Sequence, residues 1–175
     1  MSYDLMVFDP ESAPRERSTF LEWYQQSPFE DDSDIFNDPG VCSDSLRNWY
    51  RAIVGEFPDY NGDDVDDDKI DEVGDRATGY AIGPTAIYAD FRWQAAEAAY
   101  DTVRRLAVEH QVGFYDVSGD EGDGEIYFPG DKLREPSQGQ WRQISADFQT
   151  GDLSKYMPES EPPKRRWWDI FRRNK

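Results

Sequence analysis

The pattern of apolar and polar positions predicts five short strands. Residues 3 to 9, YDLMVFD, are almost continuously apolar between polar ends, which is typical of a strand covered on both faces. In residues 77 to 93, Ile87, Ala89 and Phe91 alternate with polar neighbours after a Gly83-Pro84 break, a pattern that predicts a hairpin. Residues 112 to 118 and 125 to 130 predict another strand pair, joined by an acidic, glycine-rich turn.

A helical period appears in segments between these strands. Residues 12 to 26 carry an apolar stripe through Phe20, Leu21 and Tyr24, with Ser12 as the expected N-cap. Residues 43 to 57 repeat apolar side chains at helical spacing after Ser43 or Asp44 as the cap.

Two further helices are expected in the second half of the chain. Residues 93 to 111 form an alanine-rich segment with one apolar face. A weaker pattern through Trp141, Ile144 and Phe148 predicts the last helix. Residues 27 to 42 gather Ser, Pro, Asp, Asn and Gly, which indicates a loop.

This order of elements predicts an α+β fold, with a mixed, mainly antiparallel sheet of about five strands. Short right-handed connections place the helices on one face of the sheet, as in a ferredoxin-like variant. The expected organisation is one domain over residues 1–157, followed by a Pro-containing spacer and a basic-aromatic tail over 158–175. Because 15% of the residues are aromatic, we expect an aromatic-rich core.

Acidic residues are concentrated in the segment 58–76, which we interpret as an acidic loop. Its centre, DYNGDDVDDDKIDE, holds eight carboxylates and one lysine without apolar periodicity. Over the whole chain 37 acids oppose 19 basic residues, a net charge of −18. Such a surface opposes nucleic-acid binding and favours a basic protein partner; the alternative is that the charge only maintains solubility. The predicted partner-binding residues are Tyr60, Asp63, Asp64, Asp66, Asp67, Asp68, Asp71 and Glu72.

Catalytic and metal-binding patterns are weak. The acidic stretch fails the spacing of a calcium-binding EF-hand loop, because Asp64 replaces the required glycine and Ile70 the required glutamate. The single histidine, His110, and the single cysteine, Cys42, lie in no catalytic motif, and no phosphate-binding glycine loop is found. We therefore expect no enzyme activity, no metal and no cofactor. The alternative is a small-molecule-binding or enzymatic domain with a pocket near the turn Asp116–Asp123.

The tail KRRWWDIFRRNK, residues 164 to 175, has a net charge of +5, which leaves −23 on residues 1 to 163. We expect the tail to fold back onto the acidic body, because its large apolar side chains would otherwise stay in water. The alternative is a short amphipathic helix that makes weak contact with an anionic membrane surface. No run of 18 apolar residues and no signal-peptide pattern is seen, so no transmembrane segment and a cytoplasmic location are expected.

Three stretches carry a family resemblance: SYDLMVFDP, PRERSTFLEWY and the later VGFYDVSGDEG with GEIYFPG. They resemble a group of small uncharacterised bacterial cytoplasmic proteins that are similar to immunity proteins of polymorphic and contact-delivered toxin systems. The resemblance implies a protein that binds and neutralises a cognate toxin, and it transfers no catalytic residue. It does not extend to the acidic insertion or to the basic tail.

Overall fold

A computed structural model describes residues 2–26, 38–61, 72–119, 124–136, 139–153 and 156. The tail predicted over 158–175 lies outside the described residues, so its fold-back and membrane interpretations stay predictions.

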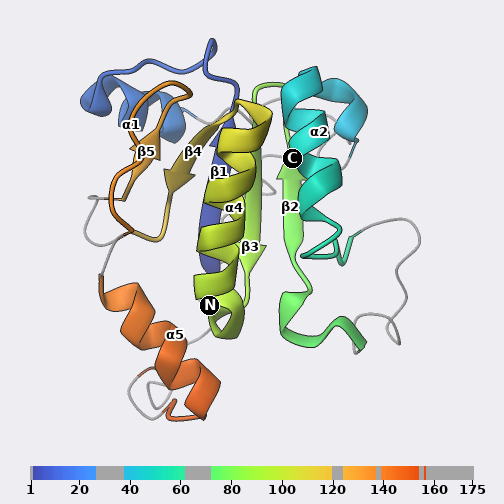
Figure 1. Cartoon of the computed structure of the whole chain (residues 1–175), viewed down its shortest axis with the longest axis vertical. Coiled ribbons are helices and arrows are strands. Elements are labelled where there is room, and N and C mark those ends of the chain that lie inside the picture. The colour runs from blue at the N-terminus through green and yellow to red at the C-terminus, as the bar shows by residue number, and fades with distance from the viewer. Residues whose placement is uncertain are drawn as a thin grey trace, which may run out of the picture.

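The centre of the molecule is a five-stranded sheet, as expected (Figure 1). Its strands lie in the order β2-β3-β1-β4-β5, and every neighbouring pair is antiparallel. The α+β class and the mainly antiparallel sheet of five strands are therefore confirmed, and among the described residues parallel pairing is found only at the isolated bridge between Asp59 and Thr78. The strands are β1 (Tyr3–Phe8), β2 (Gly79–Ile82), β3 (Ala86–Phe91), β4 (Gly113–Asp116) and β5 (Ile126–Tyr127).

Two long helices connect strands that run in the same direction but are not neighbours. Strands β1 and β2 are parallel with β3 between them, and β3 and β4 are parallel with β1 between them. Helix α2 (Asp44–Ile53) lies in the first connection and α4 (Ala96–His110) in the second. This interleaving follows the split β-α-β pattern, with β5 added at one edge. Helices α2 and α4 pack against each other on one face of the sheet.

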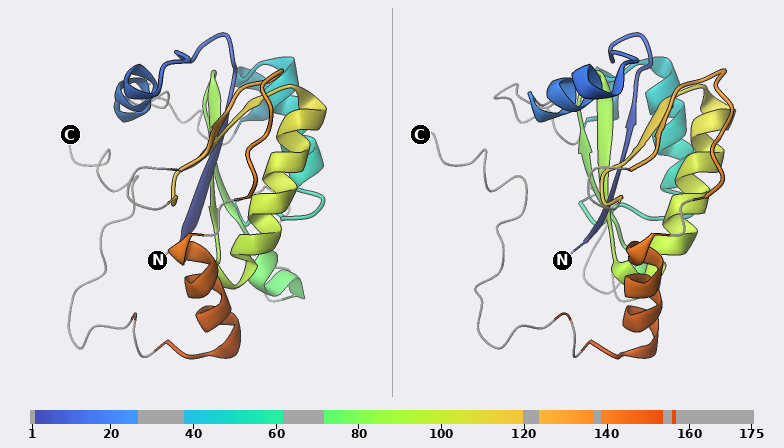
Figure 2. Two further views of the ribbon diagram at one scale, coloured as in Figure 1. Left: turned by 60° about the vertical axis from the view of Figure 1, so that its left-hand side comes forward. Right: turned by 90° about the vertical axis from the view of Figure 1, so that its left-hand side faces the viewer.

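Helix α1 (Arg17–Gln25) lies on the opposite face of the sheet (Figure 2). The expectation that the helices share one face therefore holds for α2 and α4 but not for α1. The cause lies in β1, where Leu5 and Val7 face the α2–α4 side, while Met6 and Phe8 face away from it. Phe20 of α1 covers Phe8 at a ring-centroid distance of 5.0 Å, so the predicted burial of this strand on both faces is confirmed.

The start of α1 differs from the sequence expectation. Its N-cap is Glu16, whose carboxylate accepts a hydrogen bond from Thr19 N at 3.0 Å, so the choice of Ser12 was wrong. Hydrogen bonds from Ser18 and Thr19 lower the pKa of Glu16 to about 2. Helix α2 begins as predicted, because Ser43 Oγ accepts from Leu46 N at 3.5 Å.

The last helix, α5 (Gln140–Thr150), is present where the weak pattern placed it. It packs below the sheet against the 3₁₀ turn η3 (Trp93–Ala95), to which Ser145 Oγ donates a hydrogen bond at Trp93 O, 2.8 Å away. Trp141 stacks on Tyr3 of β1 at 4.9 Å. Two further 3₁₀ turns, η1 (Pro39–Val41) and η2 (Gly74–Arg76), precede α2 and β2.

The aromatic-rich core is confirmed on both faces of the sheet. The larger cluster lies between the sheet and helices α2, α4 and α5, and it includes Tyr3, Trp49, Phe57, Phe91, Tyr100, Phe114 and Trp141. The smaller cluster lies under α1 and includes Phe8, Phe20, Tyr88, Tyr115 and Phe128. Aromatic pairs of this kind are stabilised beyond their buried area when the rings are tilted or offset.

Candidate partner-binding surface

The predicted acidic surface is only partly within the described residues. Tyr60 and Glu72 are described, whereas the other predicted acids, Asp63, Asp64, Asp66, Asp67, Asp68 and Asp71, lie outside them. What the structure establishes is how the two ends of this segment are held.

The first end is tied to the sheet through Tyr60. Its hydroxyl donates to the carboxylate of Asp90 in β3, at 3.3 Å from each oxygen. Gly79 of β2 lies directly beneath this contact, and its N–H also donates to Asp90 Oδ1 at 3.3 Å. A Cβ on Gly79 would overlap the Tyr60 hydroxyl and lie 2.8 Å from Asp90 Oδ2. Tyr60 therefore packs the segment against the sheet.

Asp59 strengthens the same anchor. Its carboxylate accepts hydrogen bonds from the Tyr50 hydroxyl at 2.7 Å and from Asn61 N at 2.8 Å. The backbone around it pairs with the beginning of β2, because Tyr60 N donates to Thr78 O and Thr78 N donates to Pro58 O, both at 3.0 Å. Burial raises the pKa of Asp59. This acid is a structural residue rather than part of the exposed charge.

The second end returns to the sheet through η2. Glu72 is exposed, and Gly74 takes a left-handed backbone with φ of 60°, which favours glycine. The guanidinium of Arg76 then lies over the Phe57 ring at 5.4 Å and donates to Glu56 O at 3.3 Å. Both ends of the acidic segment are thus held by contacts to the folded domain.

A hollow of about 480 Å³ lies beside the first anchor, between η1 and the exposed side of α2. It is lined by Asp38, Pro39, Gly40, Arg47, Tyr50 and Arg51. The hollow and the anchor share Tyr50, whose hydroxyl binds Asp59. No sequence pattern predicts this hollow, because its residues belong to a predicted loop and to the outer side of a helix whose periodicity marks only its apolar face.

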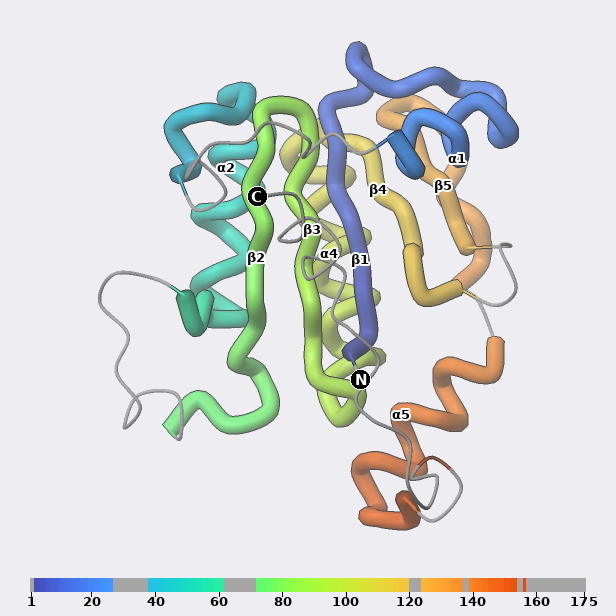
Figure 3. Tube along the Cα trace, turned by 180° about the vertical axis from the view of Figure 1, so that it is seen from behind, coloured from blue at the N-terminus to red at the C-terminus, as the bar shows by residue number. Residues whose placement is uncertain are grey.

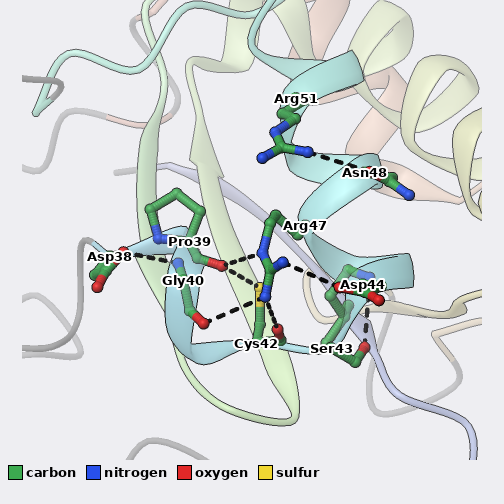
Figure 4. Close-up of polar contacts among 10 residues, drawn as sticks. Asp38, Pro39, Gly40, Cys42, Ser43, Asp44, Arg47, Asn48 and Arg51 are labelled. Carbon is green, nitrogen blue, oxygen red and sulfur yellow. Dashed lines mark hydrogen bonds and ion pairs between the residues drawn. The ribbon is translucent and has the colours of Figure 1, made fainter.

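Arg47 builds the wall of the hollow (Figure 4). Its Nε donates to Pro39 O at 3.1 Å, and its Nη2 donates to Gly40 O at 3.3 Å and to Cys42 O at 3.0 Å. Its Nη1 pairs with Asp44 at 3.0 Å. These bonds satisfy backbone carbonyls in front of the helix and fix η1 against α2.

Two acidic residues lie in register on the face of the sheet that carries α1; Figure 3 views the sheet from this side. Asp4 of β1 and Asp90 of β3 are direct cross-strand partners, so their side chains leave the same face. Asp4 Oδ1 is buried and accepts no hydrogen bond, and burial raises the pKa of this carboxyl. No local sequence signal predicts the pair, because it depends on the register between strands about 80 residues apart.

The alternative pocket near the turn Asp116–Asp123 is not favoured by the described part of that turn. Asp116 is 1% exposed and accepts a hydrogen bond from the Tyr3 hydroxyl at 3.2 Å, inside the core. Ser118 Oγ accepts from Asp4 N at 2.8 Å, so it too has a structural contact. Asp120 and Asp123 lie outside the described residues.

The other candidate catalytic residues are poorly placed for chemistry. Cys42 is buried with its thiol 3.1 Å from Pro39 O, and burial raises its thiol pKa, which disfavours the reactive thiolate. His110 ends α4, and its Nε2 is buried without a hydrogen-bond partner, so no carboxylate orients it at that nitrogen. Among the described residues, no three His, Cys, Asp or Glu side chains cluster as a metal site would require.

Comparisons with protein-family models, with curated proteins and with solved structures find no match for this chain. Within the described ranges, no helix has the length and apolar character needed to cross a bilayer.

Proposed function

We propose that the protein is an immunity-type binder that neutralises a cognate bacterial toxin by covering its basic surface with the acidic segment. The observation that carries the proposal is the anchoring of this segment at both ends. Tyr60 and Asp59 hold one end, and η2 with Arg76 holds the other.

The charge of the segment supports a basic partner. Complementary charge raises association rates and excludes wrong partners, whereas a few buried contacts supply most of the affinity. The described candidates for catalysis, Cys42, His110 and Asp116, are buried or lack the partners that catalysis requires. A binding role therefore fits the described residues better than an enzymatic role.

The first experiment asks whether a toxin exists. The products of the genes neighbouring this one are expressed singly in a susceptible bacterium, with and without this protein. We expect one product to be toxic alone and tolerated in its presence, and to form a complex with it after purification. If no neighbouring product is both toxic and neutralised, the immunity proposal is wrong.

A second experiment tests the acidic segment. We expect a variant with Asp63, Asp64, Asp66 and Asp67 changed to Asn to associate with the toxin about tenfold more slowly at low salt, with a flatter salt dependence. The matched control removes the same charge elsewhere, from the exposed residues Glu11, Glu22, Asp101 and Glu135. Equal association rates for the two variants would exclude the segment from the interface.

A further inference from the structure

We infer that Arg51, at the hollow between η1 and α2, binds a carboxylate side chain of the partner protein. The inference rests on the proposed function and adds a second contact to it. In this contact our protein supplies the positive charge and the partner supplies the negative charge. The partner would therefore present an acidic residue near its basic surface.

Arg51 has the donors for such a contact. It is exposed, and its Nη1 makes one long hydrogen bond, to Asn48 Oδ1 at 3.4 Å (Figure 4). No carboxylate of the described residues pairs with it, although acids outnumber basic residues 37 to 19 in the chain. A guanidinium presents five N–H donors in a planar fork that matches a carboxylate in a bidentate manner.

The neighbouring arginine has a different role. The guanidinium of Arg47 is held by three backbone carbonyls and by Asp44, so it fixes the wall rather than offering a free fork. A rigid wall lowers the conformational entropy that is lost when a ligand binds. Arg51 therefore lies beside a wall whose geometry is already fixed by Arg47, although its own side chain is exposed.

The charges around the hollow favour a carboxylate over a phosphate. Asp38 lies on the rim, where its Oδ1 accepts from Gly40 N at 2.7 Å, and Asp44 lies beside Arg47. With a net charge of −18 on the whole chain, these acids repel a dianion more strongly than a single negative charge. A single carboxylate is therefore the anion whose charge best matches this site.

The position of the hollow indicates a protein as the source of that carboxylate. Tyr50 lines the hollow and its hydroxyl also binds Asp59, so the hollow adjoins the anchored first end of the acidic segment. A protein partner has the size to reach both. Adjacent contacts of opposite sign also fix the orientation of a complex, because a rotated partner would place like charges together.

The test uses defined peptides and the arginine Nε–Hε signals of ¹⁵N-labelled protein at constant ionic strength. The signal of Arg51 is assigned by its loss in Arg51→Gln, a surface variant whose fold is checked by thermal melting. We expect acetyl-Glu-Glu-Glu-amide to move the Arg51 signal about twice as far as that of Arg105, because Arg105 is already paired with Glu56 and Glu109. Acetyl-Gln-Gln-Gln-amide is the neutral control.

Three outcomes would overturn the inference: no movement of the Arg51 signal, equal movement with the neutral peptide, or a larger movement with inorganic phosphate at the same concentration. With the toxin, Arg51→Gln should weaken binding about two- to fivefold, as for an exposed ion pair. If the toxin is neutralised but neither the peptide nor this variant has an effect, the inference fails and the proposed function stands. If the acidic peptide binds but no toxin exists, the proposed function fails separately.

Discussion

The hydroxyl of Tyr60 lies 3.3 Å from both carboxylate oxygens of Asp90 and donates a hydrogen bond to that group across Gly79. Tyr60 precedes the acidic residues Asp63 to Asp71, and Asp90 is on β3, which lies between β2 and β1 in the sheet. One side-chain contact therefore connects the start of the acidic segment to an interior strand of the sheet.

Replacing Gly79 by alanine should break this contact. The added Cβ would overlap the Tyr60 hydroxyl, and both it and Asp90 would have to move. We expect a loss of about 1–3 kcal/mol in the free energy of unfolding, as for other overpacked sites. Tyr60→Phe, which removes only the hydroxyl, should cost about 0.5–1.5 kcal/mol. Urea denaturation measures both, and a Gly79→Ala variant as stable as the wild type would contradict the described packing.

Removing one partner of the buried ion pair between Arg104 and Glu125 should strongly lower the free energy of unfolding. Arg104 Nε lies 2.8 Å from Glu125 Oε2, and the Tyr100 hydroxyl donates to the same oxygen at 2.7 Å. Since both partners are at most 10% exposed, Glu125→Leu leaves a buried guanidinium without its counter-ion and should cost about 3–5 kcal/mol.

The control for this prediction is an exposed pair. Arg15 and Asp131 are 3.2 Å apart but 62% and 52% exposed, so Asp131→Asn should cost less than about 1 kcal/mol. The double variant Arg104→Met with Glu125→Leu should recover stability relative to Glu125→Leu alone, because it removes the stranded charge. Similar losses for the buried and the exposed single variants would show that burial does not determine the cost.

Asp4 should make stability depend on pH. Burial raises the pKa of its carboxyl in the folded state, so the folded protein holds this proton more tightly than the unfolded chain does. The resulting contribution to the free energy of unfolding is present below the unfolded pKa of about 3.9 and declines as the pH rises toward the folded pKa.

The measurement compares Asp4→Asn with the wild type in urea denaturation at a series of pH values. The asparagine variant cannot ionise, so its stability relative to the wild type should improve as the pH rises above about 4. The comparison cancels the general repulsion among the other acids, which both proteins share. A stability difference that stays constant over this range would show that Asp4 has an unshifted pKa.

The rate at which the Cys42 thiol is labelled should depend on how firmly the wall of the hollow is held. The thiol is buried beside Pro39, and Arg47 binds the carbonyl groups of both residues. We expect Arg47→Gln to loosen this turn and to raise the rate at which a disulfide reagent labels Cys42 by about tenfold, because the open form gains about 1.4 kcal/mol. Arg51→Gln is the matched control and should label at the wild-type rate. Equal acceleration in both variants would contradict the different roles of the two arginines.

Periodicity alone was sufficient to predict much of the fold. The apolar run at 3–9 and the helical spacing at 43–57 and 93–111 predicted β1, α2 and α4, because these patterns directly reflect which side chains must leave water. The N-cap of α1 was not predictable in this way. Glu16 caps the helix although Ser12 is the residue type usually found there.

The order of the helices and strands, the α+β class and the acidic charge that favours a basic partner all follow from the amino-acid sequence. The folded structure was needed to show that α1 covers the second face of the sheet, that the Tyr60 hydroxyl donates to Asp90, and that Arg51 borders a hollow next to Asp59. The physical reason is that these relationships depend on strand register and helix packing between segments distant in the chain, whereas local periodicity specifies only which face of each element is apolar.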